Sequence, residues 1–346
     1  MNRLLPHASD TFEGSFEVAY DVLKHTSDRL KQNAESSLAI PEYLFVKGDP
    51  KSYRVLTQTR AIISLVKLGQ ILLESRLSGL AHDVYRFNRN HFMDALKGDG
   101  CNLYDLSFII YSLSALIADG KEKESYYSDL EISFSHLEKK CNSDELFKSR
   151  HGEFPYEEQN SAMHLVEALG SLRQHKITDS ELLTKTCEIL FEKFYDPQSG
   201  LVAERLDDRG APLSFEIGHC FEWSSLIEEM CLPSPYTPDS KSLYKAACER
   251  AEYLPNGIII NSYTGALKPA ATDERIWPSL EFIRAGINLK SDNVEKYLKD
   301  FNFTFFYDNR FKEHISDKNL FIKTTSVYHL VECFKLGPKV TFAITR

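Results

Sequence analysis

Three histidine–glutamate pairs stand out because each occurs inside an otherwise apolar segment. In each pair the glutamate follows the histidine by three positions, so both side chains would lie on one face of a helix. The pairs are His164 with Glu167, His219 with Glu222, and His329 with Glu332. Histidine has an unperturbed pKa near neutral, which suits it to proton transfer. Histidine and glutamate also ligate zinc or manganese, but the pairs lack the H-E-x-x-H spacing, so we expect no metal.

Other polar residues stand at the starts of apolar segments. A buried polar side chain needs a hydrogen-bonding partner, and these residues would converge if their segments were neighbours. They are Gln58 and Arg60, Tyr104, Asn160 (four positions before His164), and Trp277 (four positions before Glu281). No G-x-G-x-x-G, G-x-x-x-x-G-K-[ST] or G-x-S-x-G pattern occurs, so dinucleotide-binding, P-loop and α/β-hydrolase functions have no support.

The segments that carry these residues have helical periodicity and recur regularly. About twelve segments show apolar residues at a period of 3.6. Six strongly apolar ones begin near residues 57, 103, 160, 219, 276 and 324 and alternate with charged, amphipathic ones. An all-round apolar helix is buried and an amphipathic helix covers it, so the repeat predicts stacked helix pairs. The first and last apolar helices lack the polar faces that cap an open array. We therefore expect the helix pairs to close into a single all-α (α/α)₆ barrel over residues 1–346. Two proline-containing loops, 149–159 and 232–240, would lie at its rim.

These motifs resemble those of the N-acylglucosamine 2-epimerase superfamily of sugar epimerases and isomerases. The matches run in order along most of the chain: Q-x-R at Gln58 and Arg60, Tyr-Asp at 104–105, Q-N-x-x-M-H-L-x-E-A at 159–168, G-H-x-x-E-W at 218–223, W-P-x-x-E at 277–281, and Y-H-L at 328–330. The end of the last segment, KTTSVYHL, is more similar to the mannose isomerase branch than to the cellobiose 2-epimerases.

The resemblance implies cofactor-free and metal-free proton transfer beside a sugar carbonyl. It makes His219 and His329 the acid–base residues at the sugar C2, with Glu222 holding and polarising His219. It gives Arg60 and His164 the role of stabilising charge on the sugar oxygens. It assigns sugar binding to Tyr104, Asn160, Trp277 and Glu281. Return of the proton to C1 would produce a ketose, and return to the opposite face of C2 would invert that centre.

Several alternatives remain open from the residues alone. An N-acylglucosamine-type 2-epimerase differs from a mannose-type isomerase only in where the proton returns. An (α/α)₆ glycoside hydrolase needs two carboxylates, for which Glu222 and Glu281 are the candidates. A non-catalytic sugar-binding paralogue would keep the fold, and the departures at Ile217 and Leu106 leave room for it. Arg275 and Lys323 would serve either an anionic substrate or rim salt bridges.

Other histidines and carboxylates have structural interpretations. We expect His91, His136 and His175 to be core residues whose hydrogen bonds are satisfied. Glu167 and Glu332 would form salt bridges.

The composition indicates which kinds of partner and which cellular compartment to expect. The chain has 346 residues, with 41 Lys and Arg against 50 Asp and Glu, for a net charge of −9, which disfavours nucleic-acid binding. Seven scattered cysteines without a C-x-x-C pair are typical of reduced thiols. The N-terminal sequence has no sustained apolar core, and no segment is long enough to span a bilayer. We therefore expect a cytoplasmic protein, in one or two copies, whose partner is a monosaccharide.

Overall fold

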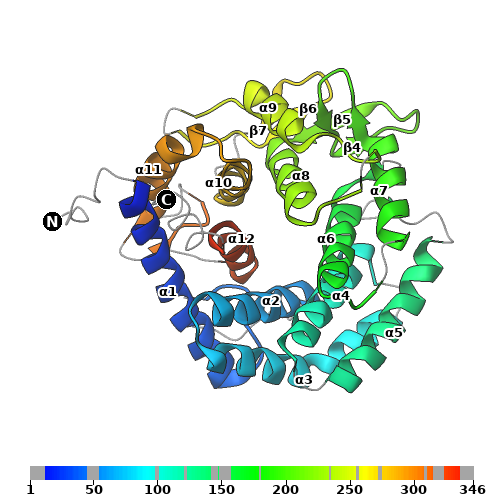
Figure 1. The fold of residues 1–346 in the computed structure, drawn as a ribbon, viewed down its shortest axis with the longest axis vertical. Helices are drawn as coiled ribbons and strands as arrows, with labels where there is room; N and C mark the ends of the chain where they lie inside the picture. The colour runs from blue at the N-terminus through cyan, green and yellow to red at the C-terminus, as the bar shows by residue number, and fades with distance from the viewer. Residues whose placement is uncertain are drawn as a thin grey trace.

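The computed structural model describes residues 12–44, 54–97, 101–120, 123–141, 147, 157–178, 181–233, 235–254, 257–271, 275–307, 310–314 and 323–335. Within these ranges twelve α-helices form two concentric rings (Figure 1). The inner helices are α2 (Val55–Ile71), α4 (Leu103–Asp119), α6 (Asn160–Gln174), α8 (Ile217–Glu229), α10 (Trp277–Leu289) and α12 (Thr324–Phe334). The outer helices are α1 (Phe12–Ser37), α3 (Ser75–Lys97), α5 (Lys123–Cys141), α7 (Glu181–Phe194), α9 (Ser240–Arg250) and α11 (Asn293–Phe305).

The ring is closed between the two ends of the chain. Helix α12 packs against α2, and α1 covers α12 as the outer partner, so the sixth helix pair joins the first helix to the last. The other five inner helices each pack against the outer helix that follows in sequence. The predicted (α/α)₆ barrel is therefore confirmed.

Burial follows the apolar pattern of the sequence. In α4 every residue from Leu103 to Ile117 except Asp105 is buried, whereas outer helices such as α7 bury only one face. The six inner helices begin within two residues of the predicted positions. Helix α4 begins after Asn102, whose side chain accepts a hydrogen bond from the Asp105 amide at 2.8 Å, and ends at Gly120 in the left-handed conformation.

Short strands, which the sequence pattern did not predict, add a small antiparallel sheet beside α8. Its order is β1 (Glu157–Glu158), β4 (Arg205–Leu206), β5 (Pro212–Glu216), β6 (Ser262–Thr264) and β7 (Pro269–Ala271). Two hairpins, β2 (Tyr195–Asp196) with β3 (Leu201–Val202) and β8 (Phe306–Tyr307) with β9 (Arg310–Phe311), complete the strands described. Strand β5 leads directly into α8, so the sheet fixes the residues in front of that helix.

Three further observations concern the sequence-based expectations. All seven cysteines are free thiols. Across the described ranges, no helix has both the length and the apolarity to cross a bilayer. Of the two loops expected at the rim, residues 149–156 and 234 lie outside the described residues; Glu158 borders the cavity described below, but no described residue of 232–240 does.

Candidate active site

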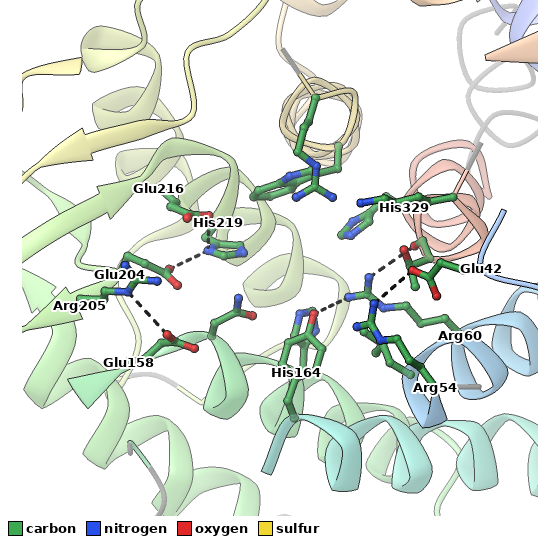
Figure 2. A pocket seen from close by; sticks show the side chains of 17 residues that line it. Glu42, Arg54, Arg60, Glu158, His164, Glu204, Arg205, Glu216, His219 and His329 are labelled. Carbon is green, nitrogen blue, oxygen red and sulfur yellow. Dashed lines mark hydrogen bonds and ion pairs between the residues drawn. The ribbon is translucent and has the colours of Figure 1, made fainter. Parts of the chain in front are cut away.

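The first turns of all six inner helices line one cavity of about 280 Å³. These turns contribute Leu56 and Arg60, Tyr104, Asn160 and His164, His219, Trp277, and Thr325 and His329. Seven of the nine predicted site residues are therefore brought together; Glu222 and Glu281 do not line the cavity. Figure 2 shows His219 and His329 on opposite sides of the cavity, with His164 between them. We call the end of the barrel at which these helices begin the mouth.

His219 is held by two carboxylates from the small sheet. Its Nδ1 lies 2.7 Å from Oε2 of Glu204 and 3.3 Å from Oε2 of Glu216. Gln159 donates a hydrogen bond to the same Glu204 oxygen at 2.8 Å and accepts one from Trp223 Nε1 at 2.9 Å. The arrangement fixes the ring and leaves Nε2 as the nitrogen available to a ligand.

These carboxylates keep His219 protonated. Burial alone lowers the pKa of His219, but the negative charges of Glu204 and Glu216 outweigh burial and raise it to about 10. Burial likewise tends to raise the pKa of Glu204, yet the His219 charge holds it below its ordinary value. Each group therefore stabilises the charged form of the other, and the pair suits the donation of a proton from His219.

Glu222 does not hold His219, contrary to the expectation from its spacing. Both of its carboxylate oxygens are buried without a hydrogen bond among the described residues, because Glu204 and Glu216 occupy Nδ1 of His219. Burial and the nearby carboxylates of Glu281 and Glu167 raise the pKa of Glu222 well above its ordinary value. Glu222 therefore lies outside the cavity lining, and its surroundings favour the neutral form of its carboxyl group.

His329 has the opposite character. Its Nδ1 lies 2.8 Å from Oε1 of Glu281, which is fully buried. Burial and the positive charge of Arg60 hold the pKa of His329 well below its ordinary value. A neutral ring that donates Nδ1–H to Glu281 would present the Nε2 lone pair to the cavity, which suits the acceptance of a proton.

Glu281 is fully buried, lies outside the cavity lining and contacts His329, so its contacts suit the positioning of that histidine better than the predicted role in sugar binding. Its other oxygen accepts a hydrogen bond from Nη1 of Arg284 at 3.2 Å. Burial raises the pKa of Glu281 to about 7, although Arg284 acts in the other direction. The carboxylate that orients His329 thus gains its negative charge near neutral pH.

Arg60, Tyr104 and His164 form the floor between the two histidines. Nη2 of Arg60 donates to the Tyr104 hydroxyl at 2.9 Å, and its guanidinium lies 4.4 Å from the centre of the Phe108 ring. His164 bonds Glu167 through Nδ1 at 3.1 Å, and burial lowers its pKa to about 3. A neutral imidazole and a guanidinium, both fixed by neighbours, suit the stabilisation of charge on ligand oxygens.

Trp277 and Asn160 complete the walls. The Trp277 ring centre lies 4.9 Å from that of His219 and 5.7 Å from that of His329. A methyl group on Gly218 would come within 2.6 Å of this tryptophan ring, which explains the glycine before His219. Oδ1 of Asn160 is buried and accepts no hydrogen bond from a described residue, so a ligand hydroxyl could bond it.

Three groups of side chains are compact enough to hold a metal ion. They are His164 with Glu167 and Glu222, Glu204 with Glu216 and His219, and Glu222 with Glu281 and His329, and within each group the ligand atoms lie within 4.8 Å of one another. In each group the histidine already shares a hydrogen bond with a carboxylate of that group. Shared protons therefore account for the close approach of each histidine to that carboxylate, whereas Glu222, a member of two groups, makes no hydrogen bond to a described residue.

Sequence reasoning missed Glu204 and Glu216. Glu204 lies between two strands of two residues each, and no periodic pattern marks so short an element. Glu216 stands at the end of β5, three positions before His219. The same three-residue spacing was therefore present on the N-terminal side of the histidine and could have indicated Glu216 as a partner. Glu332 does form ion pairs as expected, with Lys67 and Lys335.

Fold and site together define a closed α-helical barrel whose mouth holds two histidines with pKa values shifted in opposite directions. A sequence profile of the N-acylglucosamine 2-epimerase (GlcNAc 2-epimerase) family matches residues 59–319. The chain belongs to this family, and it is a sugar epimerase or isomerase. No protein of curated function matches the chain by sequence.

Solved structures share the fold. A D-mannose isomerase superposes with a TM-score of 0.70 at 16% identity, covering 97% of this chain and 100% of its own. A cellobiose 2-epimerase from Bacillus thermoamylovorans gives 0.65 at 14%, covering 82% and 87%. An α-1,6-mannanase from a Salegentibacter species gives 0.62 at 12%, covering 94% and 99%. At these identities the superpositions establish the fold only.

Proposed function

We propose that the protein interconverts a mannose-type aldose and its ketose by proton transfer between C2 and C1. The observation that carries the proposal is the pair of histidines on opposite sides of one cavity, with the pKa of His219 raised and that of His329 lowered. Two groups whose environments push their pKa values apart divide the roles of acid and base between them. A ketose–aldose conversion needs both roles at adjacent carbons.

In the proposed reaction Nε2 of His329 removes the proton from C2 of the open-chain aldose. His219 donates its Nε2 proton to the carbonyl oxygen on C1, which gives a 1,2-enediol. His329 then returns its proton to C1, and the hydroxyl on C2 gives its proton to His219 as the new carbonyl forms. Both histidines end in their initial states, and no electron acceptor is needed.

The surrounding residues have supporting roles in this proposal. Arg60 and His164 stabilise negative charge that develops on the sugar oxygens. Tyr104 and Asn160 bind hydroxyl groups, and Trp277 packs on the sugar face. Glu281 and Glu204 keep their histidines in the required tautomer and charge state.

The size of the cavity favours a monosaccharide. Its volume of about 280 Å³ lies at the lower limit for small-molecule sites, about 300 Å³, which suits a single hexose better than a disaccharide. Glycoside hydrolysis is disfavoured, because the two carboxylates considered for it, Glu222 and Glu281, lie outside the cavity lining. Glu281 bonds His329, and Glu222 is buried without a hydrogen bond to a described residue.

A 2-epimerase is the second candidate. His219 and His329 lie on opposite sides of the cavity, so a protonated His219 could deliver a proton to the face of C2 opposite to the one that His329 deprotonates. This would invert C2 without forming a ketose. An N-acylated amino sugar would be the substrate expected for that outcome.

Incubation in D₂O with NMR detection tests the proposal. Mannose, glucose, fructose and N-acetylmannosamine are each followed for deuterium at C1 and C2. The isomerase proposal predicts ketose with deuterium at C1; deuterium at C2 with inversion and no ketose would favour epimerisation instead. Absence of exchange with every sugar would refute both.

Two variants assign the residues. Asparagine can replace the Nδ1–H donor of a histidine but has no counterpart of Nε2, so His329→Asn and His219→Asn should each lower exchange at least about 100-fold, the usual contribution of acid–base catalysis. His136→Asn, on the outer helix α5, is the control. Full activity in both site variants would show that other groups transfer the proton.

A further inference from the structure

The cavity has an uneven distribution of charge. Figure 2 shows Glu204 and Glu216 on the side of His219, and Arg54 and Arg60 on the side of His329. The mechanism above uses Arg60 but leaves Arg54 and Lys323 without a role, although both line the cavity. We call the surface formed by Arg54, Arg60, Lys323 and Thr325 the basic wall.

The basic wall carries excess positive charge. Glu42 is the carboxylate that borders it among the described lining residues, and it is already engaged by Arg54 at 3.2 Å and by the Thr57 hydroxyl. The ammonium of Lys323 makes no ion pair with any described residue. Three cations thus face one carboxylate.

Two helices also begin at this wall. Arg54 is the N-cap residue of α2 and Lys323 is that of α12, and neither side chain caps its helix. The first amide groups of a helix lack internal carbonyl partners and, with the helix dipole, favour an anion. The segment at 42–43 joins the two helices, because the Thr324 amide donates to the Glu42 carbonyl at 2.9 Å.

A buried polar atom on the wall lacks a partner. Arg60 is 6% exposed, and its Nε is buried without a hydrogen bond to a described residue. Burying such a group is costly unless something bonds it, and an oxyanion beside the guanidinium would supply an acceptor. Thr325 lines the same side of the cavity, where its hydroxyl could donate to the same ligand.

We infer that the basic wall is an anion subsite, so that the substrate is a hexose with a phosphate or sulfonate on the carbon remote from C1. This inference rests on the proposed function for the orientation of the sugar. Lys323 precedes His329 by six positions, which corresponds to about 9 Å along a helix axis. This span suits a hexose with C1 and C2 at the histidines and a charged C6 substituent at the mouth.

Competition between neutral and charged sugars tests the subsite. The D₂O assay is run with mannose, mannose 6-phosphate and the corresponding 6-sulfonate. We expect kcat/KM to be at least about tenfold higher for one of the charged sugars, with the preference weakening as salt is added. The charged sugar that is preferred identifies the anion.

Variants of Lys323 test whether the preference for charged sugars depends on the basic wall. Lys323→Met should lower the ratio of charged to neutral kcat/KM at least about tenfold, and Lys323→Arg should retain it. Lys245→Met removes an exposed lysine of α9 as the control. Equal use of neutral and charged sugars, or a ratio unchanged in Lys323→Met, would overturn the subsite.

Binding separates this inference from the proposed reaction. Mannitol 6-phosphate and mannitol lack a reactive carbonyl, and calorimetry compares their affinities. Tighter binding of the phosphate that depends on Lys323 supports the subsite even if no sugar is turned over, in which case the proposed reaction alone fails. Turnover of mannose with equal affinity for the two alditols would uphold the reaction and refute the subsite.

Discussion

Replacement of Glu204 by glutamine should change the pH dependence of the enzyme more than its activity at neutral pH. Nδ1 of His219 lies 2.7 Å from Glu204 and 3.3 Å from Glu216, and these charges raise the pKa of His219 to about 10. Glutamine preserves the size of the side chain and a hydrogen-bonding oxygen but removes one of the two charges.

The expected magnitude follows from the pKa. The difference between 6.5 and about 10 corresponds to about 5 kcal/mol in favour of protonated His219. Burial lowers the pKa and is unaffected by the substitution, so removing one of two equal carboxylates takes away more than half of the net shift, and the pKa falls below about 8. At pH 9.5 the protonated fraction then falls by more than about 20-fold, and at pH 7 it falls by much less.

Initial rates of exchange from C2, measured by NMR between pH 6 and pH 11, give the profile. The wild type should show an alkaline limb near pH 10, and Glu204→Gln a limb below about pH 8, with Glu192→Gln on α7 as the control. Circular dichroism at each pH checks that the variant is folded. A profile that is merely scaled down, with its alkaline limb in place, would refute the assignment of His219 as the acid held by Glu204.

Four further outcomes follow from the same contacts. Glu281→Gln should lower kcat at least about tenfold with little change in KM and remove the acid limb expected near pH 7; a change in KM alone would indicate sugar binding instead. Glu332→Gln should lower the free energy of unfolding in urea by about 3–5 kcal/mol, because it removes the carboxylate paired with Lys67 and one of the two paired with Lys335; an unchanged transition midpoint would contradict this. Folding raises the pKa of His219, so its stabilisation is complete below about pH 6.5 and is lost as pH rises to about 10; the free energy of unfolding should fall over this range by more in the wild type than in His219→Asn. Dialysis against EDTA should leave the exchange rate unchanged, since the histidines transfer the proton without a Lewis acid, and restoration of lost activity by added metal would argue for one of the carboxylate–histidine groups as a metal site.

The architecture was predictable because the inner helices are apolar on all sides. Long apolar segments with a repeat near 58 residues leave few solutions other than a ring of helix pairs, and the starts at residues 103, 160 and 324 coincide with those predicted. The cavity residues stand near these starts, which is why most of them could be named from sequence.

The partners of the histidines could not be predicted in the same way. The spacing along one helix placed Glu222 on the same face as His219. Such spacing says nothing about carboxylates that belong to other strands or turns and pack against the histidine. Glu204 comes from a turn between short strands and lies closer to the ring. For Trp277 and Glu281 the i, i+4 spacing correctly gave a shared face, yet one residue lines the cavity and the other lies behind His329.

The protonation states of the two histidines are the basis of the proposed chemistry, and ¹⁵N NMR of histidine-labelled protein at pH 7.5 measures them directly. His219→Asn and His329→Asn assign the two resonances. The structure predicts that both ring nitrogens of His219 carry protons, and that His329 is neutral with its proton on Nδ1. A neutral His219 or a charged His329 at this pH would contradict the account.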